Sequence, residues 1–350
     1  MASALRATAL SIMVAVLGAC GSGGGGGGST TAPAGSDTPP PSGGTPPQQG
    51  GTTPPASNTP PAGATNQSSG SGSAPRVDVP FTQFSAVQAN QRAIMSGSAT
   101  TINGTQTKTG NEVVVTETGP FVTDGPATLA LGFDKQRALT TVGINAPQGS
   151  VSFDRAAAGN SISCPSGGHC NASSATASAV IGNALQNGWN YQTFGAWATQ
   201  TSPTTFVLGG VSAGNATPGN AVPTTGLFTF TGIAGGYFID QAGTRFTTSA
   251  SMIANVDFQN RNIGFGTLDT TLVNSKTGIA TRNEGLDLSG GFSWNAGTNS
   301  LTGQLQSRNE NVSGPANGRF YGPKAEEIGG TYNLVGGTVS RMVGGFGGKR

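Results

Sequence analysis

Three cysteines and a single histidine are the residues of this 350-residue chain best suited to chemistry. Cys164 and Cys170 have five residues between them, Pro165-Ser166-Gly167-Gly168-His169. In an exported protein, two cysteines placed across such a Pro/Gly turn are expected to form a disulfide that closes a small loop. The alternative is a metal or haem site made by Cys164, His169 and Cys170, which would require reduced thiols and a further ligand. The spacing favours the disulfide, and a loop of defined shape is a candidate binding element.

The third cysteine, Cys20, follows a short secretory-type segment. Residues 1–19 contain one cation, Arg6, then an apolar run from Ala7 to Val16 and small residues directly before the cysteine. A run of this length is typical of a cleavable signal peptide rather than a membrane-spanning helix. Because the motif resembles a lipobox, we predict that Cys20 is acylated and anchors the chain to the outer membrane. The alternative is an ordinary signal peptide with an incidental cysteine.

No arrangement typical of catalysis accompanies these residues. His169 is the only base of its type in the chain, and no G-x-S-x-G nucleophile motif is present. Glu326 and Glu327 are adjacent, so on a strand they would point apart, and we expect both to be ion-paired or solvated surface charges. The terminal Gly347–Arg350 segment lacks the Ser/Thr and following helix of a phosphate loop. The sequence therefore predicts no catalytic residues, no metal ligands and no enzyme.

A cluster of aromatic residues lies shortly after the cysteine loop, and its members are Trp189, Tyr191, Phe194 and Trp197. Such a cluster is most often part of a hydrophobic core, but tryptophan and tyrosine are also enriched at binding surfaces. Trp189 and Tyr191, together with His169, are therefore the candidate ligand-binding residues.

Composition divides the chain into a linker and a folded part. Residues 20–75 consist almost entirely of Gly, Ser, Thr, Pro, Gln, Ala and Asn, which cannot bury enough apolar surface to fold. Only 9% of the chain is charged, and the net charge is +2. This charge gives no electrostatic reason to expect a nucleic-acid partner.

Residues 76–222 predict a β-rich domain with two short helices. A 3.6-residue apolar period indicates a helix over Phe81–Met95, and a second is expected around Ala175–Ala184. The strands are indicated by β-branched, aromatic and alternating apolar residues at Val113–Thr116, Leu129–Phe133, Val151–Phe153, Gly188–Trp197 and Phe206–Leu208.

Residues 223–350 alternate more regularly. Met252, Ala254, Val256 and Phe258 share one face, and the same pattern recurs in segments that begin at Phe228, Leu286 and Leu301. In these segments the apolar residues are opposed by mostly polar ones, Asp287 among them. One-sided strands separated by turn residues predict an antiparallel barrel or sandwich, and the many glycines within them suit the curvature of a small barrel.

The C-terminal motifs resemble those of the transferrin-binding protein B-like surface lipoproteins. They are Gly318-Arg319-Phe320-Tyr321-Gly322-Pro323-Lys324-Ala325-Glu326-Glu327-Ile328-Gly329-Gly330, Gly344-Gly345-Phe346-Gly347-Gly348-Lys349-Arg350, Pro223–Gly232 and Ala254-Asn255-Val256-Asp257-Phe258. The resemblance covers about residues 204–350. It implies a β-rich handle-like domain followed by an eight-stranded antiparallel β-barrel, displayed on the cell surface by an outer-membrane translocon.

The resemblance also implies a function in binding. We therefore expect a surface-exposed lipoprotein that binds a ligand or a host or environmental protein carrying iron or haem, with no enzymatic activity. Haem bound through His169 is a second expectation that the resemblance brings. The alternative is a structural or adhesive envelope lipoprotein with no specific small ligand.

Overall fold

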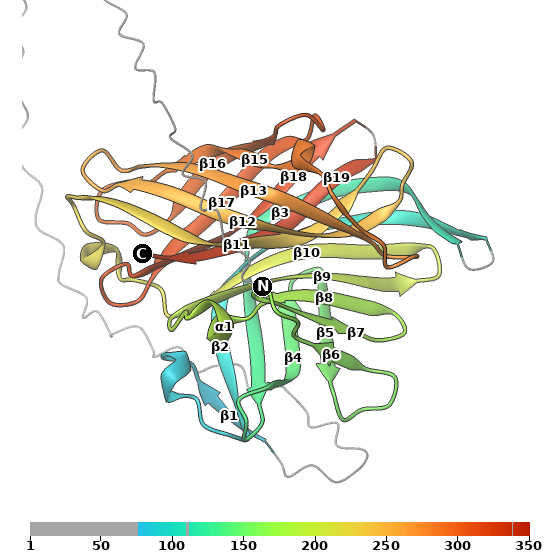
Figure 1. Cartoon of the computed structure of the whole chain (residues 1–350), viewed down its shortest axis with the longest axis horizontal. Helices are drawn as coiled ribbons and strands as arrows, with labels where there is room; N and C mark the ends of the chain where they lie inside the picture. The colour runs from blue at the N-terminus through green and yellow to red at the C-terminus, as the bar shows by residue number, and fades with distance from the viewer. Residues whose placement is uncertain (1–75, 110–111, 338) are drawn as a thin grey trace, which may run out of the picture. The chain divides into compact units, whose positions relative to one another are not determined.

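β-branched and aromatic side chains that alternate with small polar ones build two antiparallel sheets (Figure 1). The computed structural model of the chain describes residues 76–109, 112–337 and 339–350, all within one compact unit. We call the first sheet the handle. Its path runs β5-β4-β3-β2-β10-β9-β8-β7-β6, with β1 parallel to β2 at one side. Its strands are β1 Val77–Pro80, β2 Gln91–Thr109, β3 Glu112–Phe133, β4 Leu139–Ala146, β5 Gly149–Asp154, β6 Ser161–Ser163, β7 His169–Ser173, β8 Ala177–Gly182, β9 Gln192–Ser202 and β10 Thr205–Gly214.

The second sheet closes into the barrel. β12 pairs with β13 as well as with β11, so the path β12-β11-β19-β18-β17-β16-β15-β13 returns to its start. The eight-stranded antiparallel barrel expected from the sequence is confirmed. Its strands are β11 Leu227–Ile239, β12 Arg245–Asp257, β13 Asn262–Asn274, β15 Leu288–Ser293, β16 Leu301–Ser307, β17 Ser313–Tyr321, β18 Glu327–Gly336 and β19 Ser340–Lys349, with the short β14 Ala280–Arg282 added beside β13.

Strand alternation fills the barrel with aromatic rings. Phe258 lies 5.1 Å from Phe320 and 5.8 Å from Trp294 between ring centroids, and Phe265 lies 4.8 Å from Phe346. These contacts have the tilted and edge-to-face geometries that aromatic pairs favour. Asp287 is an exception to the expected outward polar face, because it is buried and accepts bonds from the backbone N–H and hydroxyl of Thr270.

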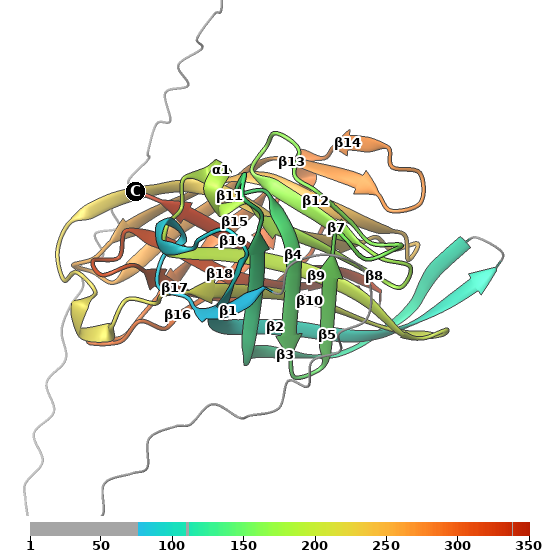
Figure 2. The ribbon, with the colours of Figure 1, turned by 90° about the horizontal axis from the view of Figure 1, so that it is seen from below.

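The handle is a sheet that almost closes on itself. Its two edge strands, β5 and β6, come close together without pairing, and its core includes Leu129, Phe153, Phe194 and Trp197. Figure 2 shows β3, β4 and β5 side by side across one wall of the handle. One end of this curved sheet is bordered by the short helix α1, Ala184–Asn187.

Both helices expected from the sequence are wrong over most of their length. Within Phe81–Met95 only Phe84–Ala86 forms a short 3-10 turn (η1), and from Gln91 the chain is strand β2, with Ala93 and Met95 facing the core at a period of two. Ala177–Gly182 is strand β8, paired on both sides, and α1 begins only at Ala184. The expected strand over Gly188–Trp197 begins at Gln192. Pairing with neighbouring strands overrides local helix propensity at these alanine-rich segments.

Cys20, the signal peptide of residues 1–19 and the linker of residues 20–75 lie outside the described residues. In the part of the chain that is described, no helix combines the length and hydropathy needed to cross a membrane.

Candidate functional site

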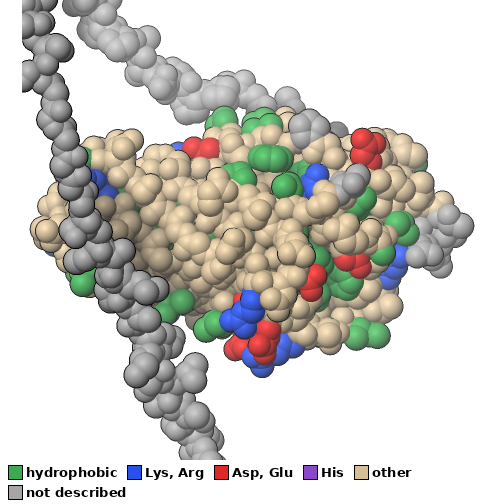
Figure 3. Space-filling model, turned by 90° about the horizontal axis from the view of Figure 1, so that it is seen from above, with side chains coloured by type: hydrophobic (Ala, Val, Ile, Leu, Met, Phe, Trp, Pro, Cys, Tyr) green, Lys and Arg blue, Asp and Glu red, His purple; other side chains and the backbone are tan. Residues whose placement is uncertain are grey.

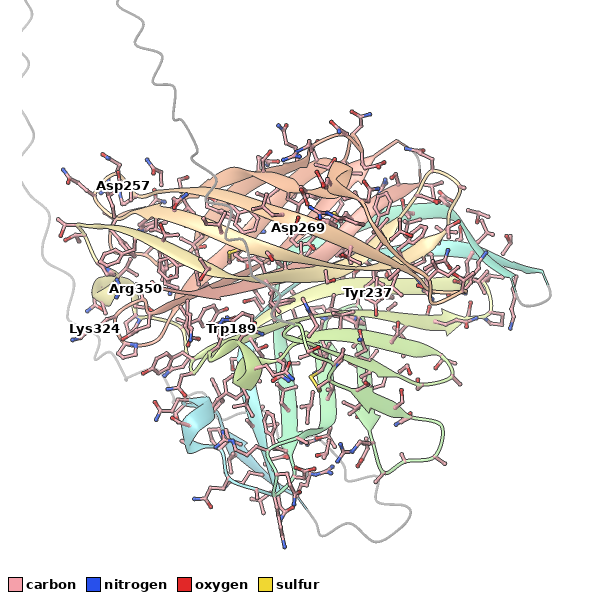
Figure 4. The ribbon with its side chains drawn as sticks, in the orientation of Figure 1. Trp189, Tyr237, Asp257, Asp269, Lys324 and Arg350 are labelled. Carbon is pink, nitrogen blue, oxygen red and sulfur yellow. A yellow bond between two sulfur atoms is a disulfide. The ribbon has the colours of Figure 1, made fainter. Side chains whose placement is uncertain are left out.

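The handle packs against the barrel wall along a buried contact that we call the seam, formed by β9 and β10 facing β11, β18 and β19. Glycines allow the two sheets to come unusually close. A Cβ at Gly210 of β10 would lie 2.2 Å from the carbonyl oxygen of Gly344 in β19, and one at Gly345 would lie 3.0 Å from Phe194. Trp189 and Tyr237 lie where the handle meets the barrel in Figure 4. Sheet-on-sheet contact therefore explains Gly345 and Gly347 of the C-terminal glycine motif, whose added Cβ atoms would meet handle residues.

One end of the seam is held by the carboxylate of Glu327. Its two oxygens accept the backbone N–H groups of Asn190, Tyr191 and Gln192 at 2.5, 2.9 and 3.0 Å. The side chain is 3% exposed, and burial raises its pKa to about 7, although the three N–H donors and Lys349 act to lower it. The expectation of a surface charge is wrong for Glu327, because the handle covers it and supplies the partners that a surface glutamate would find in water or lysine.

Two tyrosine hydroxyls cross the same seam. Tyr321 of the barrel bonds Ser212 of the handle at 2.8 Å, and Tyr237 bonds Ser178 at 2.8 Å. Burial raises the pKa of each tyrosine to about 12, so both remain protonated hydroxyls at neutral pH. With Glu327, these bonds give the seam a specific register in addition to its apolar contact.

The cysteine loop lies beside the seam. Cys164 and Cys170 form a disulfide that closes the β6–β7 hairpin, with Cα atoms 4.0 Å apart. Inside this loop, the imidazole ring of His169 packs against Gly235 of the barrel, where a Cβ added to the glycine would lie 2.9 Å from the Nε2 atom of His169. Burial lowers the pKa of His169, so the imidazole is neutral at pH 7. The disulfide loop is thus held against the barrel by a neutral histidine.

Between the disulfide loop and the barrel lies a cleft of about 330 Å³. The loop supplies Pro165, Ser166 and Gly167, and the barrel supplies Thr247, Thr248 and Ser249 from β12. Pockets of this size accept small groups or a single inserted side chain. The lining combines the hydroxyl groups of these residues with apolar surface from Val180 and Val273, which suits a partner segment that has both polar and apolar groups.

The residues present do not fit haem. The Nδ1 and Nε2 atoms of His169 each lie 3.2 Å from a backbone carbonyl oxygen, of Gly167 and Ala234, so neither nitrogen is directed into open space. Cys164 and Cys170 are joined to each other. Within the described ranges, no three His, Cys, Asp or Glu side chains come together as a metal site.

The other two candidate residues are placed at the seam. Trp189 is 3% exposed and packs on Phe194, with its ring edge against Gly347. It is positioned by α1, which Asn183 caps and Gly188 ends in a left-handed conformation. Tyr191 is partly buried and packs on the Gly322 turn. The structure therefore brings His169, Trp189 and Tyr191 to one side of the handle, all packed on the barrel. Glu327 makes three hydrogen bonds across the seam, and nothing in the sequence except its position in the C-terminal motif indicates this role.

Comparison with known proteins identifies the barrel. Residues 222–350 match the family model of the C-lobe and N-lobe beta barrels of Tf-binding protein B. This part of the chain has a transferrin-binding protein B-like fold, as the sequence motifs indicated. No curated protein matches the chain.

Solved structures similar to the chain include transferrin-binding proteins of several bacteria. A point mutant of transferrin binding protein B from Haemophilus parasuis Hp5 is 14% identical over 73% of this chain and 75% of that one, with a TM-score of 0.35. Intact Ap-TbpB, with N and C lobes, is 13% identical over 75% and 77%, with a TM-score of 0.34. The isotype 1 protein from serogroup B Neisseria meningitidis is 16% identical over 71% and 63%, with a TM-score of 0.35.

Proposed function

We propose that the chain is a non-enzymatic binding lipoprotein that captures an iron- or haem-carrying protein at the surface of the outer membrane. The observation that carries this proposal is the disulfide-closed loop and its cleft, held rigidly by the seam on a transferrin-binding protein B-like barrel. A preorganised loop loses little conformational entropy when it binds, which favours affinity.

The nature of the partner is supported by the family of the barrel and by the surface chemistry. The matching family model is that of a transferrin-binding protein. Figure 3 shows a barrel face made mostly of uncharged side chains and backbone, with charged groups confined to a few small clusters. Such a surface favours binding through shape and hydrogen bonds rather than through bulk charge, as in many protein–protein interfaces.

The binding test uses residues 20–350 carrying Cys20→Ser, so that the protein is soluble. Immobilised protein is exposed to iron-loaded and iron-free transferrin and to haemoglobin, and binding is followed by surface plasmon resonance. We expect saturable binding to at least one of the three. Ser166→Arg, at the exposed loop beside the cleft, should weaken it about tenfold or more, whereas Gln304→Arg on the exposed face of β16 should leave it unchanged.

Absence of binding to all three proteins, with retention only of envelope components, would instead indicate the structural or adhesive function. Equal effects of the Ser166 and Gln304 substitutions would contradict the assignment of the loop as the contact surface. Haem alone is a further comparison, and no Soret shift dependent on His169 is expected.

Anchoring and display form a separate part of the proposal. We propose that Cys20 is acylated and that an outer-membrane translocon exposes the folded part on the cell surface. Cys20→Ala or globomycin should abolish metabolic labelling with palmitate and protease accessibility on whole cells. Unchanged labelling and accessibility would contradict the anchor while leaving the binding proposal intact.

A further inference from the structure

A second concave site lies on the handle and borders the same disulfide loop as the cleft, since Cys164 lines this site and Pro165 lines the cleft. We call it the mouth groove, because it lies at the end of the nearly closed handle sheet where the β3–β4 turn, β6 and α1 meet. Its volume is about 580 Å³. Its lining includes Phe133, Arg137, Leu139, Arg155, Ile162 and Leu185. Mouths of curved β-sheets are frequent ligand sites, since the strands hold their lining rigidly.

The floor of the mouth groove is apolar. Phe133, Leu139 and Ile162 belong to the edge of the handle core, and Leu185 and Cys164 pack against that core while remaining partly exposed. Leu185 and Cys164 present most of the apolar surface that a ligand could cover, because Phe133, Leu139 and Ile162 are each 9% exposed or less. Apolar contact of this kind contributes about 25 cal/mol per Å² removed from water.

The rim of the mouth groove is cationic. Arg137 donates to the carbonyl oxygen of Phe84 at 2.8 Å and forms no ion pair among the described residues. Arg155 bonds Asp134 at 3.0 Å, and a guanidinium has five N–H donors, so both arginines keep donors for a ligand. Hydrogen bonding of Arg137 to Phe84 also orients its side chain in advance of binding.

The backbone of Arg137 is left-handed. Its φ is +60°, in the left-handed region that glycine and asparagine favour at the last position of such a turn. A non-glycine residue there costs about 1 kcal/mol or more, and such strain is concentrated at functional positions. The bond to Phe84 offsets part of this cost, but asparagine or glycine would avoid it altogether. Arg261 has the same left-handed backbone in the β12–β13 turn, with φ +54°, so it is the place of Arg137 at the groove and its bond to Phe84 that indicate a use for its guanidinium.

From this geometry we propose that the mouth groove binds a small amphipathic carboxylate, an organic acid with an aliphatic body. The carboxylate would accept hydrogen bonds from Arg137 and Arg155, and the aliphatic body would lie on Phe133, Leu139, Ile162 and Leu185. A planar carboxylate matches the fork of a guanidinium, which makes charge-assisted bonds of this type short and directional. This site is independent of the protein partner proposed above.

The test is a titration of residues 20–350 carrying Cys20→Ser with decanoate, followed by calorimetry and by thermal denaturation. Decan-1-ol and decyltrimethylammonium serve as uncharged and cationic probes with the same aliphatic body. We expect saturable binding of decanoate and a rise in Tm, with binding of the other two probes at least tenfold weaker. Equal binding of all three probes would overturn the role of the arginines, and no binding of decanoate would overturn the site.

Variants locate the site. Arg137→Asn removes the guanidinium while suiting the left-handed backbone, so the variant should fold, and decanoate affinity should fall about tenfold or more. Arg155→Gln should act in the same direction. Arg282→Gln is the matched control, because Arg282 is an exposed arginine paired with Asp269 and Glu284 on the barrel. Undiminished affinity in Arg137→Asn and Arg155→Gln, or equal loss in Arg282→Gln, would contradict the proposal.

Discussion

At the scale of single residues, the chemistry of the seam depends on a carboxylate that the sequence suggested would be exposed. The two glutamates do point apart: Glu326, just before β18, accepts the backbone N–H of Lys324, while Glu327, the first residue of β18, turns to the handle. Local periodicity gives the direction of a side chain relative to its neighbour, but it does not reveal that a second domain covers one face. Asp287 is also buried, but inside the barrel itself, where it accepts bonds from Thr270 of β13.

Glu327 gives a prediction for the dependence of stability on pH. Its folded-state pKa, raised by burial to about 7, exceeds its ordinary value of 4.5. The folded state therefore holds the proton more tightly, and this group's stabilising contribution is full below pH 4.5 and is lost as pH rises to 7. The expected loss is roughly 3 kcal/mol. Urea unfolding at pH 4.5, 6 and 7.5 measures it.

Glu327→Gln supplies the comparison. The substitution removes titration and turns one acceptor oxygen into an N–H₂ donor facing a backbone amide, so the variant should be less stable by about 1–3 kcal/mol at pH 4.5. The difference between wild type and variant should shrink as pH rises to 7.5. His169 titrates in both proteins, and because its pKa is lowered by burial, both become less stable as pH falls below about 6.5. This effect of His169 is the same in wild type and variant, so it cancels in the difference between their stabilities. A difference independent of pH would contradict the assignment.

At the scale of elements, the close packing of the two sheets at the seam depends on glycines, which leave parts of the facing strands without side chains. The glycines in the barrel strands were expected to serve curvature, and several do lie against neighbouring barrel backbone. Gly210 and Gly345 instead let handle strands β9 and β10 lie close against β19, a role that periodicity alone cannot show. The barrel is predictable because its strands alternate strictly, whereas the start of β2, up to Met95, has a helix-like apolar period, and β8 lies within the second segment for which a helix is expected.

Gly210→Ala should separate the two sheets or strain them. The new Cβ would meet the carbonyl oxygen of Gly344 at 2.2 Å, and because that atom is backbone, it can move only with its strand. Overpacking of this kind costs about 1–3 kcal/mol. Gly264→Ala in β13 is the matched control, because nothing lies within 4 Å of its added Cβ, and it should be neutral or stabilising by up to about 1 kcal/mol. Chemical denaturation of both variants measures the effect, and similar stabilities would argue against a tight seam.

The disulfide should contribute a moderate stability to the hairpin that it closes. Cys164 and Cys170 are six positions apart, and closing so small a loop in the unfolded chain is worth about 2 kcal/mol. Replacing both cysteines by alanine should lower the free energy of unfolding by about that amount. It should also speed amide hydrogen exchange in β6 and β7 more than in the barrel strands. Uniform acceleration of exchange across both sheets would show that the disulfide supports the whole fold rather than its own loop.

At the scale of the whole molecule, the described residues have two cores joined by a third. The handle core and the barrel core are each continuous, and a smaller cluster at the seam unites Ala196, Phe206 and Leu208 of the handle with Tyr237 and Val343 of the barrel. All five are 1% exposed or less. Separation of the two sheets would expose this cluster and leave Glu327 and the three amides without partners, so neither sheet is complete alone.

The handle and the barrel should therefore unfold together. Tryptophan fluorescence can follow each one, because Trp189 and Trp197 lie in the handle core and Trp294 lies in the barrel core. In a variant with Trp189→Phe and Trp197→Phe, emission reports only the barrel, and in Trp294→Phe it reports only the handle. Within each variant, the midpoint of urea unfolding by fluorescence should coincide with that by far-ultraviolet circular dichroism, because coincident probes are the mark of a two-state transition.

Adding Gly210→Ala to each background weakens the seam, and the two midpoints should then move apart. Separate transitions already present without Gly210→Ala would mean that the seam holds the domains in place without coupling their stability, and the rigid presentation of the disulfide loop would lose its physical basis.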